Sequence, residues 1–309
     1  MAYSEVVRDL PVWRSLLSVP VNIDRFVDKA HTRGADCVQL DLEDSVPAHE
    51  KANARKLVEQ ATVKVSRGGG DISVRINCPI ELAVRDIEHA VSPLVNAIAV
   101  TKVDSASHLR ILDELVSRLE EKRGMRVGAT RFIALVETAD AFFRLHEIAH
   151  AVGRTAALIL GSEDISLACG WVPCQETLLY PKQHMIIAAN SAGIMPLGFI
   201  DTVAGIGDWD AFRRMVRRSS MFGFMGAPCI HPQQVAIANE EFKPSDEDVE
   251  YARKVVAFDE QAAATGRGSF EIDGKMIDVP IVVRARRLLA RHARIVEREK
   301  RTLAAMEAC

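Results

Sequence analysis

Short apolar segments alternate along the chain with longer segments whose apolar residues recur every three or four positions. Eight short segments have the length and β-branched content of buried strands, and they span residues 14–20, 37–43, 72–77, 97–102, 132–137, 157–162, 195–200 and 222–230. The segment 105–122 has apolar residues at 109, 112, 115, 116 and 119, which predicts a helix with one buried face. Another helix is predicted to begin near Pro47 and Glu50.

This order of eight strands, each followed by a helix, predicts an α/β fold of the parallel (β/α)₈ TIM-barrel type. The alternative is a doubly wound open sheet, which usually carries a glycine-rich phosphate-binding turn after its first strand. The corresponding segment 18–26, SVPVNIDRF, contains no glycine. A dinucleotide site of that type is therefore not expected.

The chain continues well beyond the eighth predicted strand. We expect a catalytic barrel domain over residues 1–240 and a C-terminal extension over residues 241–309. In the extension, the sequence predicts a helix ending near Ala264, a glycine-punctuated hairpin over 265–280 and a basic amphipathic helix over 281–300. We expect this extension to act as a lid on the barrel or to contact a neighbouring subunit. The apolar spacing of its last, basic helix suits docking on a partner subunit better than binding RNA.

Composition excludes several classes of protein. The 309 residues carry 39 basic and 42 acidic side chains, a net charge of −3, which argues against nucleic-acid and membrane-surface binding. No apolar run approaches the roughly 20 residues that span a bilayer, and no secretory signal is visible. The six cysteines are scattered without CxxC spacing, which favours free thiols and a cytoplasmic location.

Charged residues stand where the predicted strands end, and this is the end at which TIM barrels carry their active sites. They are Asp41, Glu43, Asp44, Arg75, Lys102, Glu137, Glu163 and Asp164. A salt-bridge network at one rim is one interpretation. The other is an active site for a hard cation and an anionic substrate, because carboxylates from separate strands suit Mg²⁺ or Mn²⁺ better than zinc. Arg75 would then offer a guanidinium fork to a substrate carboxylate.

Six motifs in consistent order resemble those of the HpcH/HpaI aldolase/citrate lyase family, in its citrate lyase β-subunit-like branch. They are RSLLSVP, DLEDSVPAHEKANAR, VRIN, ALVETADAF, GSEDISLACG and GFMGAPCIHPQQ. The resemblance covers roughly residues 13–260. It implies a TIM barrel that cleaves or forms a carbon–carbon bond beside Mg²⁺, with 3-hydroxy-acyl thioesters such as malyl-CoA, citramalyl-CoA or citryl-CoA as substrates.

The resemblance also implies roles for individual residues. Glu137 and Asp164 would bind the metal, and Arg75 would hold the substrate carboxylate and polarise the reacting oxygen. Asp41, Glu43 and Asp44 would order metal-bound water and the neighbouring basic groups. Gly161 and Ser162 of GSEDIS would bind the substrate. Arg14, His231 and Pro232 would lie near the acyl-CoA.

The segment GKMIDVPIVVRA resembles the C-terminal lid of the CoA-dependent lyases, in which an aspartate acts as acid/base in the adjacent subunit's site. That residue would be Asp278, and the arrangement implies a homotrimer or hexamer. The chain departs from the family at Ile281, where histidine is usual. It departs again at Thr101, where proline is more frequent, and this argues against a catalytic role for Lys102.

Three alternatives stay open beside a stand-alone acyl-CoA lyase. The chain could be the β-subunit of a citrate lyase complex that acts on an acyl-carrier-protein thioester. It could be a metal-binding barrel without catalysis that serves as an assembly subunit. A free-hydroxyacid aldolase of the same superfamily is the third, although such enzymes usually use a histidine base early in the barrel.

Overall fold

The computed structural model describes residues 9–202, 207–264 and 270–307. The chain forms two compact units, one made of residues up to 242 together with the last few residues, and the other made of residues 243–304.

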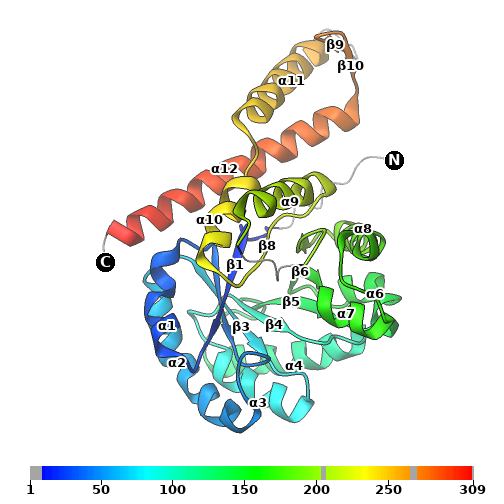
Figure 1. The fold of residues 1–309 in the computed structure, drawn as a ribbon. Coiled ribbons are helices and arrows are strands. Elements are labelled where there is room, and N and C mark those ends of the chain that lie inside the picture. Colours follow the sequence, from blue (N-terminus) through cyan, green and yellow to red (C-terminus); the bar gives the residue numbers. More distant parts are fainter. Residues whose placement is uncertain (1–8, 203–206, 265–269, 308–309) are drawn as a thin grey trace. The chain divides into compact units, whose positions relative to one another are not determined.

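The larger unit contains a parallel eight-stranded sheet that closes on itself (Figure 1). Its strands are β1 (Ser15–Pro20), β2 (Cys37–Asp41), β3 (Asp71–Ile76), β4 (Ala97–Val100), β5 (Arg131–Val136), β6 (Thr155–Leu160), β7 (Met195–Leu197) and β8 (Ala227–Cys229). Neighbours in sequence are neighbours in space, and β8 pairs with β1. A parallel bridge between Leu197 and Gly226 closes the circle. The predicted TIM barrel is confirmed.

Helices lie between the strands, as the periodicity predicted. They are α1 (Asp24–Ala30), α2 (Lys51–Ser66), α3 (Ile80–Ala90), α4 (Ala106–Lys122), α5 (Ala139–Phe142), α6 (Leu145–Ala149), α7 (Ser162–Cys169), α8 (Gln175–Ser191), α9 (Trp209–Phe222) and α10 (Pro232–Glu241). The helix predicted over 105–122 is α4, whose N-cap Ser105 accepts a hydrogen bond from the His108 amide. A 3₁₀ turn, Ala48–Glu50, precedes α2.

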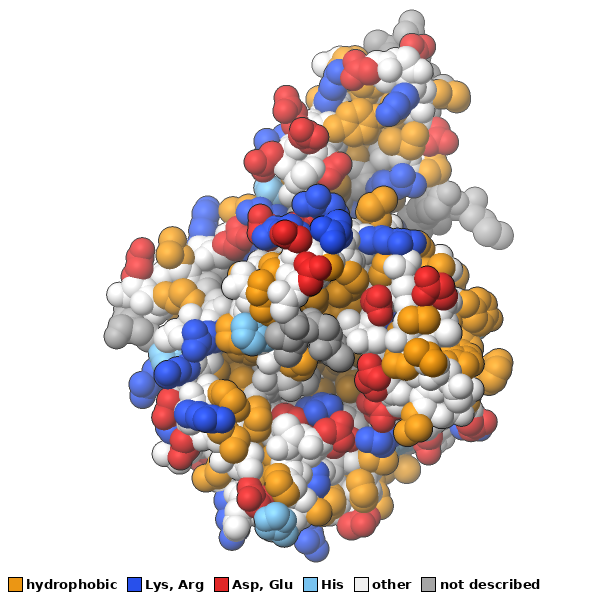
Figure 2. Space-filling view, in the orientation of Figure 1, with side chains coloured by type: hydrophobic (Ala, Val, Ile, Leu, Met, Phe, Trp, Pro, Cys, Tyr) orange, Lys and Arg blue, Asp and Glu red, His pale blue; other side chains and the backbone are white. Residues whose placement is uncertain are grey.

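The barrel has two apolar layers, because successive residues of a strand face opposite sides of the sheet. A small inner cluster fills the barrel with residues such as Leu16, Ile133 and Leu197. A larger cluster packs the outer strand faces against the helices. Acidic and basic side chains are interspersed over the face shown in Figure 2, in keeping with the small net charge.

The second unit consists of α11 (Asp246–Ala264), the antiparallel hairpin β9 (Phe270–Ile272) and β10 (Lys275–Ile277), and most of α12 (Val279–Glu307). The order helix, hairpin, helix matches the sequence prediction, although residues 265–269 of the predicted hairpin lie outside the described residues. α12 begins before and ends after the predicted span of 281–300. Ile272 and Ile277 of the hairpin belong to one buried cluster with Val255 of α11 and Val282 of α12.

The five cysteines among the described residues are unpaired, and Cys309 lies outside these residues. None of the helices in the described ranges is both long and apolar enough to cross a membrane.

Candidate active site

An ion pair between β2 and β3 forms the centre of the site. Asp41 and Arg75 are direct partners in the register of the two strands, at the carboxyl end of the barrel. Nε and Nη2 of Arg75 each donate to the Asp41 carboxylate at 2.7 Å. Burial alone would raise the pKa of Asp41, but the hydrogen bonds and positive charge of Arg75 hold it below its usual range. Asp41 thus fixes the guanidinium in one orientation.

Glu43 and Asp44 continue from β2 and face the same guanidinium. Nη1 of Arg75 lies 3.1 Å from Glu43 Oε2 and 3.4 Å from Asp44 Oδ2. Glu43 also accepts a hydrogen bond at 2.5 Å from the Lys102 ammonium. Burial raises the pKa of the Glu43 carboxyl despite these two cations. Asp44 is exposed, so it is the outermost of the three acidic residues that surround Arg75.

Glu137 follows β5 and is 5% exposed. Its Oε2 accepts a hydrogen bond of 2.7 Å from the Lys102 backbone amide. Burial, followed by the negative charges of Asp164 and Glu43, raises the pKa of Glu137 to about 7. The side chain occupies the space beside Gly161, where an added Cβ would lie 2.7 Å from Glu137 Cγ. Glycine at position 161 is therefore what allows Glu137 to adopt this position.

These two carboxylates, Glu137 and Asp164, fit a divalent cation. Glu137 is buried and feels the charge of Asp164, which lies in the first turn of α7 after β6. Such repulsion is relieved when a cation binds between the carboxylates. Over the described ranges, no group of three or more His, Cys, Asp or Glu side chains is arranged to hold a metal. A pair of carboxylates suits Mg²⁺, which commonly takes one or two protein carboxylates and fills the other positions with water and substrate oxygens.

Three further predicted residues lie at the same end of the barrel. Ser162 is the first residue of α7, directly after Gly161. His231 caps the N-terminus of α10 after β8, and Pro232 is the first residue of that helix. The His231 ring stacks on Trp209 with centroids 5.1 Å apart. His231 Nδ1 accepts the Gln233 amide hydrogen at 3.1 Å, so this nitrogen is used for capping.

Arg14 does not join the site, which corrects the expectation that it lies near the acyl-CoA. It precedes β1 and is therefore at the amino end of the barrel, opposite the other residues. The side chain is 2% exposed, and it donates to both Asp36 oxygens, at 2.8 and 3.0 Å. Another donor reaches the carbonyl oxygen of Asn239. Arg14 thus joins β1 to the segment before β2 and to α10.

Asp278 belongs to the second unit, where it lies between β10 and α12 and is exposed. Its backbone carbonyl accepts hydrogen bonds from the Ile281 and Val282 amides at the start of α12. The acid/base role of Asp278 stays a prediction from the sequence.

Two lysines at this end of the barrel make contacts that sequence reasoning missed. Lys102 contacts Glu43 through its ammonium and Glu137 through its backbone amide. Lys182 in α8 is 2% exposed and donates to the backbone carbonyl of Asp201, and burial lowers the pKa of its ammonium to about 7. The burial of Lys182 could have been predicted from the sequence, because its spacing from Leu178 and Met185 places it on the same buried face of the helix.

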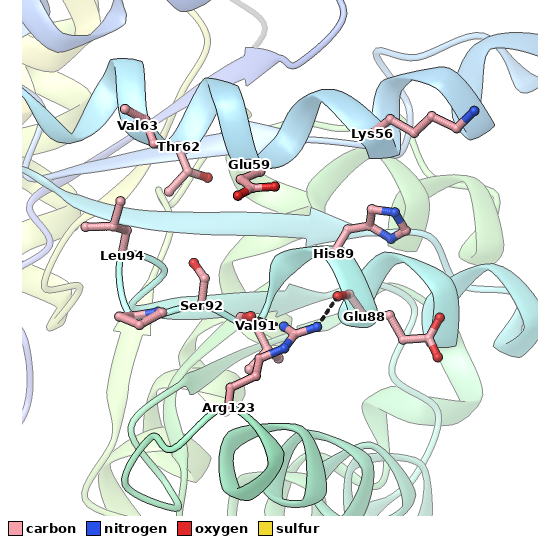
Figure 3. A pocket seen from close by; sticks show the side chains of 11 residues that line it. Lys56, Glu59, Thr62, Val63, Glu88, His89, Val91, Ser92, Leu94 and Arg123 are labelled. Carbon is pink, nitrogen blue, oxygen red and sulfur yellow. Dashed lines mark hydrogen bonds between the residues drawn. The ribbon is translucent and has the colours of Figure 1, made fainter.

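A separate groove of about 500 Å³ lies on the outer wall of the barrel (Figure 3). Residues of α2, α3 and the segment after α3 line it, together with Arg123 at the end of α4. The Arg123 guanidinium donates to backbone carbonyls of Glu88 and Val91. None of the predicted site residues lies in this groove.

Comparison with known proteins gives one family. The family model described as HpcH/HpaI aldolase/citrate lyase matches residues 14–232. Citrate lyase subunit beta of Leuconostoc mesenteroides subsp. cremoris is 32% identical over 89% of this chain and 92% of its own length. L-malyl-CoA/beta-methylmalyl-CoA lyase of Cereibacter sphaeroides is also 32% identical, over 87% of this chain and 91% of its own length.

Among solved structures, this chain is similar to protein CitE from Mycobacterium tuberculosis in complex with magnesium, acetoacetate and coenzyme A, with a TM-score of 0.68. The two chains are 26% identical, and the match covers 93% of this chain and all of the CitE chain. The family match, the two relatives and the shared barrel agree with the motifs at the strand ends. The chain belongs to the HpcH/HpaI aldolase/citrate lyase family.

Proposed function

We propose that the chain is a Mg²⁺-dependent carbon–carbon lyase that cleaves a 3-hydroxy-acyl-CoA to acetyl-CoA and a 2-oxo acid. The observation that carries this proposal is the buried Glu137 beside Asp164, at the same rim as the guanidinium that Asp41 fixes. The names of the relatives, which include citrate lyase β-subunits and malyl-CoA lyases, support a substrate of the malyl-CoA, citramalyl-CoA or citryl-CoA type.

Glu137 and Asp164 would hold the metal, which when bound supplies Lewis-acid polarisation of the substrate oxygens. Arg75 would bind the substrate carboxylate. One N–H of Nη2 is used by Asp41, and its second N–H has no partner among the described residues, so it is available to an anion. As the carbon–carbon bond breaks, Arg75 would stabilise the negative charge that develops on the oxygens, a contribution commonly of about 3–4 kcal/mol for one well-placed donor.

The substrate hydroxyl would lose its proton as the carbon–carbon bond breaks, and Asp278 would return one proton to the α-carbon of the thioester enolate and so release acetyl-CoA. In the reverse direction it would take that proton from acetyl-CoA. Delivery of Asp278 by the lid of an adjacent subunit requires an oligomer, and we propose a homotrimer or hexamer. The unpaired thiols of the described cysteines support a cytoplasmic location.

The test is a cleavage assay on malyl-CoA, citramalyl-CoA and citryl-CoA in parallel, with detection of the released oxo acid. Turnover of one substrate that is lost with EDTA and restored by Mg²⁺ is the expected result. Glu137→Gln should abolish it, whereas Glu121→Gln, at an exposed position on α4, should leave it unchanged. Turnover that persists in EDTA would contradict the proposed role of the metal.

The second candidate is a citrate lyase β-subunit acting on a carrier-protein thioester, which the similarity to such subunits favours. The same assay separates the two. Turnover of free CoA thioesters supports the stand-alone lyase. Turnover of a citryl thioester only when it is attached to an acyl-carrier protein supports the β-subunit, and Mg²⁺ binding with no turnover of either supports a barrel that serves assembly.

A further inference from the structure

Lys102 has a backbone conformation that residues with a side chain seldom adopt. Its φ is +50°, in the left-handed region where a Cβ is crowded by the neighbouring backbone. Among the described non-glycine residues only Asp273 shares this feature, and it lies in the turn between β9 and β10. Lys102 is thus the one such residue that the structure describes in the barrel, and strain of this kind persists only where surrounding structure enforces it.

The neighbours of Lys102 provide that enforcement. Thr101 donates its hydroxyl hydrogen to the carbonyl oxygen of Ile76 on β3 at 2.9 Å. Val103 donates its amide hydrogen to the carbonyl oxygen of Leu135 on β5 at 2.8 Å. The residue before Lys102 is therefore hydrogen-bonded to β3, and the residue after it is hydrogen-bonded to β5. Lys102 adopts the left-handed conformation between these two hydrogen-bonded residues.

The consequence of the turn is the direction of the Lys102 amide. Its N–H donates to Glu137 Oε2 at 2.7 Å, the one hydrogen bond that the structure gives this carboxylate within the described ranges. The hydrogen bond occupies Oε2 and leaves Oε1 without a donor from the described part of the chain. Gly161 provides the space on the other side, since its missing Cβ would come within 3.1 Å of Oε1. The Lys102 amide thus orients the carboxylate and the open space at Gly161 accommodates it, which leaves Oε1 available to a ligand.

The ammonium of Lys102 has a different partner, because it donates to Glu43 Oε1 at 2.5 Å. One residue therefore holds two carboxylates by two separate groups. The amide depends on the backbone conformation and the ammonium on the side chain, so substitution can separate them.

We propose that Lys102 is a positioning residue whose left-handed backbone orients Glu137 as a metal ligand, independently of its ammonium group. This inference rests on the proposed function, in which Glu137 binds Mg²⁺. It assigns to the Lys102 backbone a role in a site where sequence context argued against a catalytic role for its side chain.

The test compares Lys102→Asn with Lys102→Val in the full-length chain, with Mg²⁺ affinity measured by isothermal titration calorimetry in the absence of substrate. Both variants lack the ammonium, but asparagine tolerates the left-handed region and the β-branched valine does not. Loss of a group that orients a metal ligand typically weakens metal binding by about 10–100-fold. We expect the valine variant to bind Mg²⁺ at least about tenfold more weakly than the asparagine variant.

Equal affinities of the two variants would overturn the inference, because the backbone conformation would then not matter. If Lys102→Val prevents folding, as judged by thermal unfolding, Lys102→Gly and Lys102→Ala provide a second pair of variants that differ in tolerance of the left-handed region. Lys102→Gly should then bind Mg²⁺ more tightly than Lys102→Ala. Wild-type protein that binds no Mg²⁺ would refute the proposed metal role of Glu137 and the present inference with it. Binding by the wild type with equal affinities within both pairs refutes the inference alone.

Discussion

Replacing Arg75 by methionine removes the cation that fixes Asp41 and leaves a carboxylate that is fully buried. Removal of one partner from a buried pair generally costs about 3–5 kcal/mol of folding free energy. Asp41 keeps three other donors, which are the amides of Glu43 and Ser45 and the Ser45 hydroxyl. We therefore expect the lower end of that range, about 3 kcal/mol. The matched control is Arg75→Lys, which keeps the positive charge but not the paired hydrogen bonds and should lose less, about 1–2 kcal/mol.

The pH dependence of this loss provides the sharper test. In the wild type, Arg75 lowers the pKa of Asp41, so this stabilisation is present above the unfolded-state pKa and is lost as pH falls through the folded-state value. In Arg75→Met, burial without the guanidinium raises the pKa of Asp41, and acid relieves the penalty by protonating it. The difference in free energy of unfolding between wild type and Arg75→Met should therefore decrease from pH 7 toward pH 4.

The assay is urea unfolding of wild type, Arg75→Met and Arg75→Lys at several pH values, followed by circular dichroism and tryptophan fluorescence together. Coincidence of the two probes checks that a single transition is being measured. A difference that stays constant across this pH range, or equal losses in the methionine and lysine variants, would refute the reasoning. The latter result would mean that the positive charge at position 75 contributes little beyond the paired hydrogen bonds.

Three other outcomes are expected. Gly161→Ala should weaken Mg²⁺ binding by about tenfold or more in calorimetry, because the new methyl group meets Glu137 Cγ at 2.7 Å; unchanged affinity would show that Glu137 moves freely. Asp278→Asn should abolish lyase turnover while Mg²⁺ and oxo-acid binding stay intact, and retained turnover would remove Asp278 from the mechanism. Because burial lowers the pKa of Lys182 to about 7, below its unfolded-state value, wild-type stability should rise as pH increases from 7 toward 10. Lys182→Met should flatten that rise in urea midpoints, and identical slopes would show that Lys182 is not responsible.

The sequence by itself determined the class of fold and most of the rim. Eight apolar runs separated by helical periodicity specify a parallel barrel, and each observed strand lies within its predicted run or within one or two residues of it. Asp41, Arg75 and Glu137 could be assigned to one end because each stands at or just after the end of an apolar run. The same logic applied to Arg14, which stands at the start of a run, points to the opposite end, where the structure has it. There the motif resemblance misled.

Only the tertiary structure decided which groups meet. Strand order along the chain tells which end a residue occupies, but the partner of a side chain depends on register between strands and on closure of the barrel. The pairing of Asp41 with Arg75 follows from such a register. The amide of Lys102 reaches Glu137 because attachments to β3 and β5 impose a left-handed turn, and Gly161 matters because Glu137 from another strand fills its space. These are contacts between residues distant in sequence, so no local pattern encodes them.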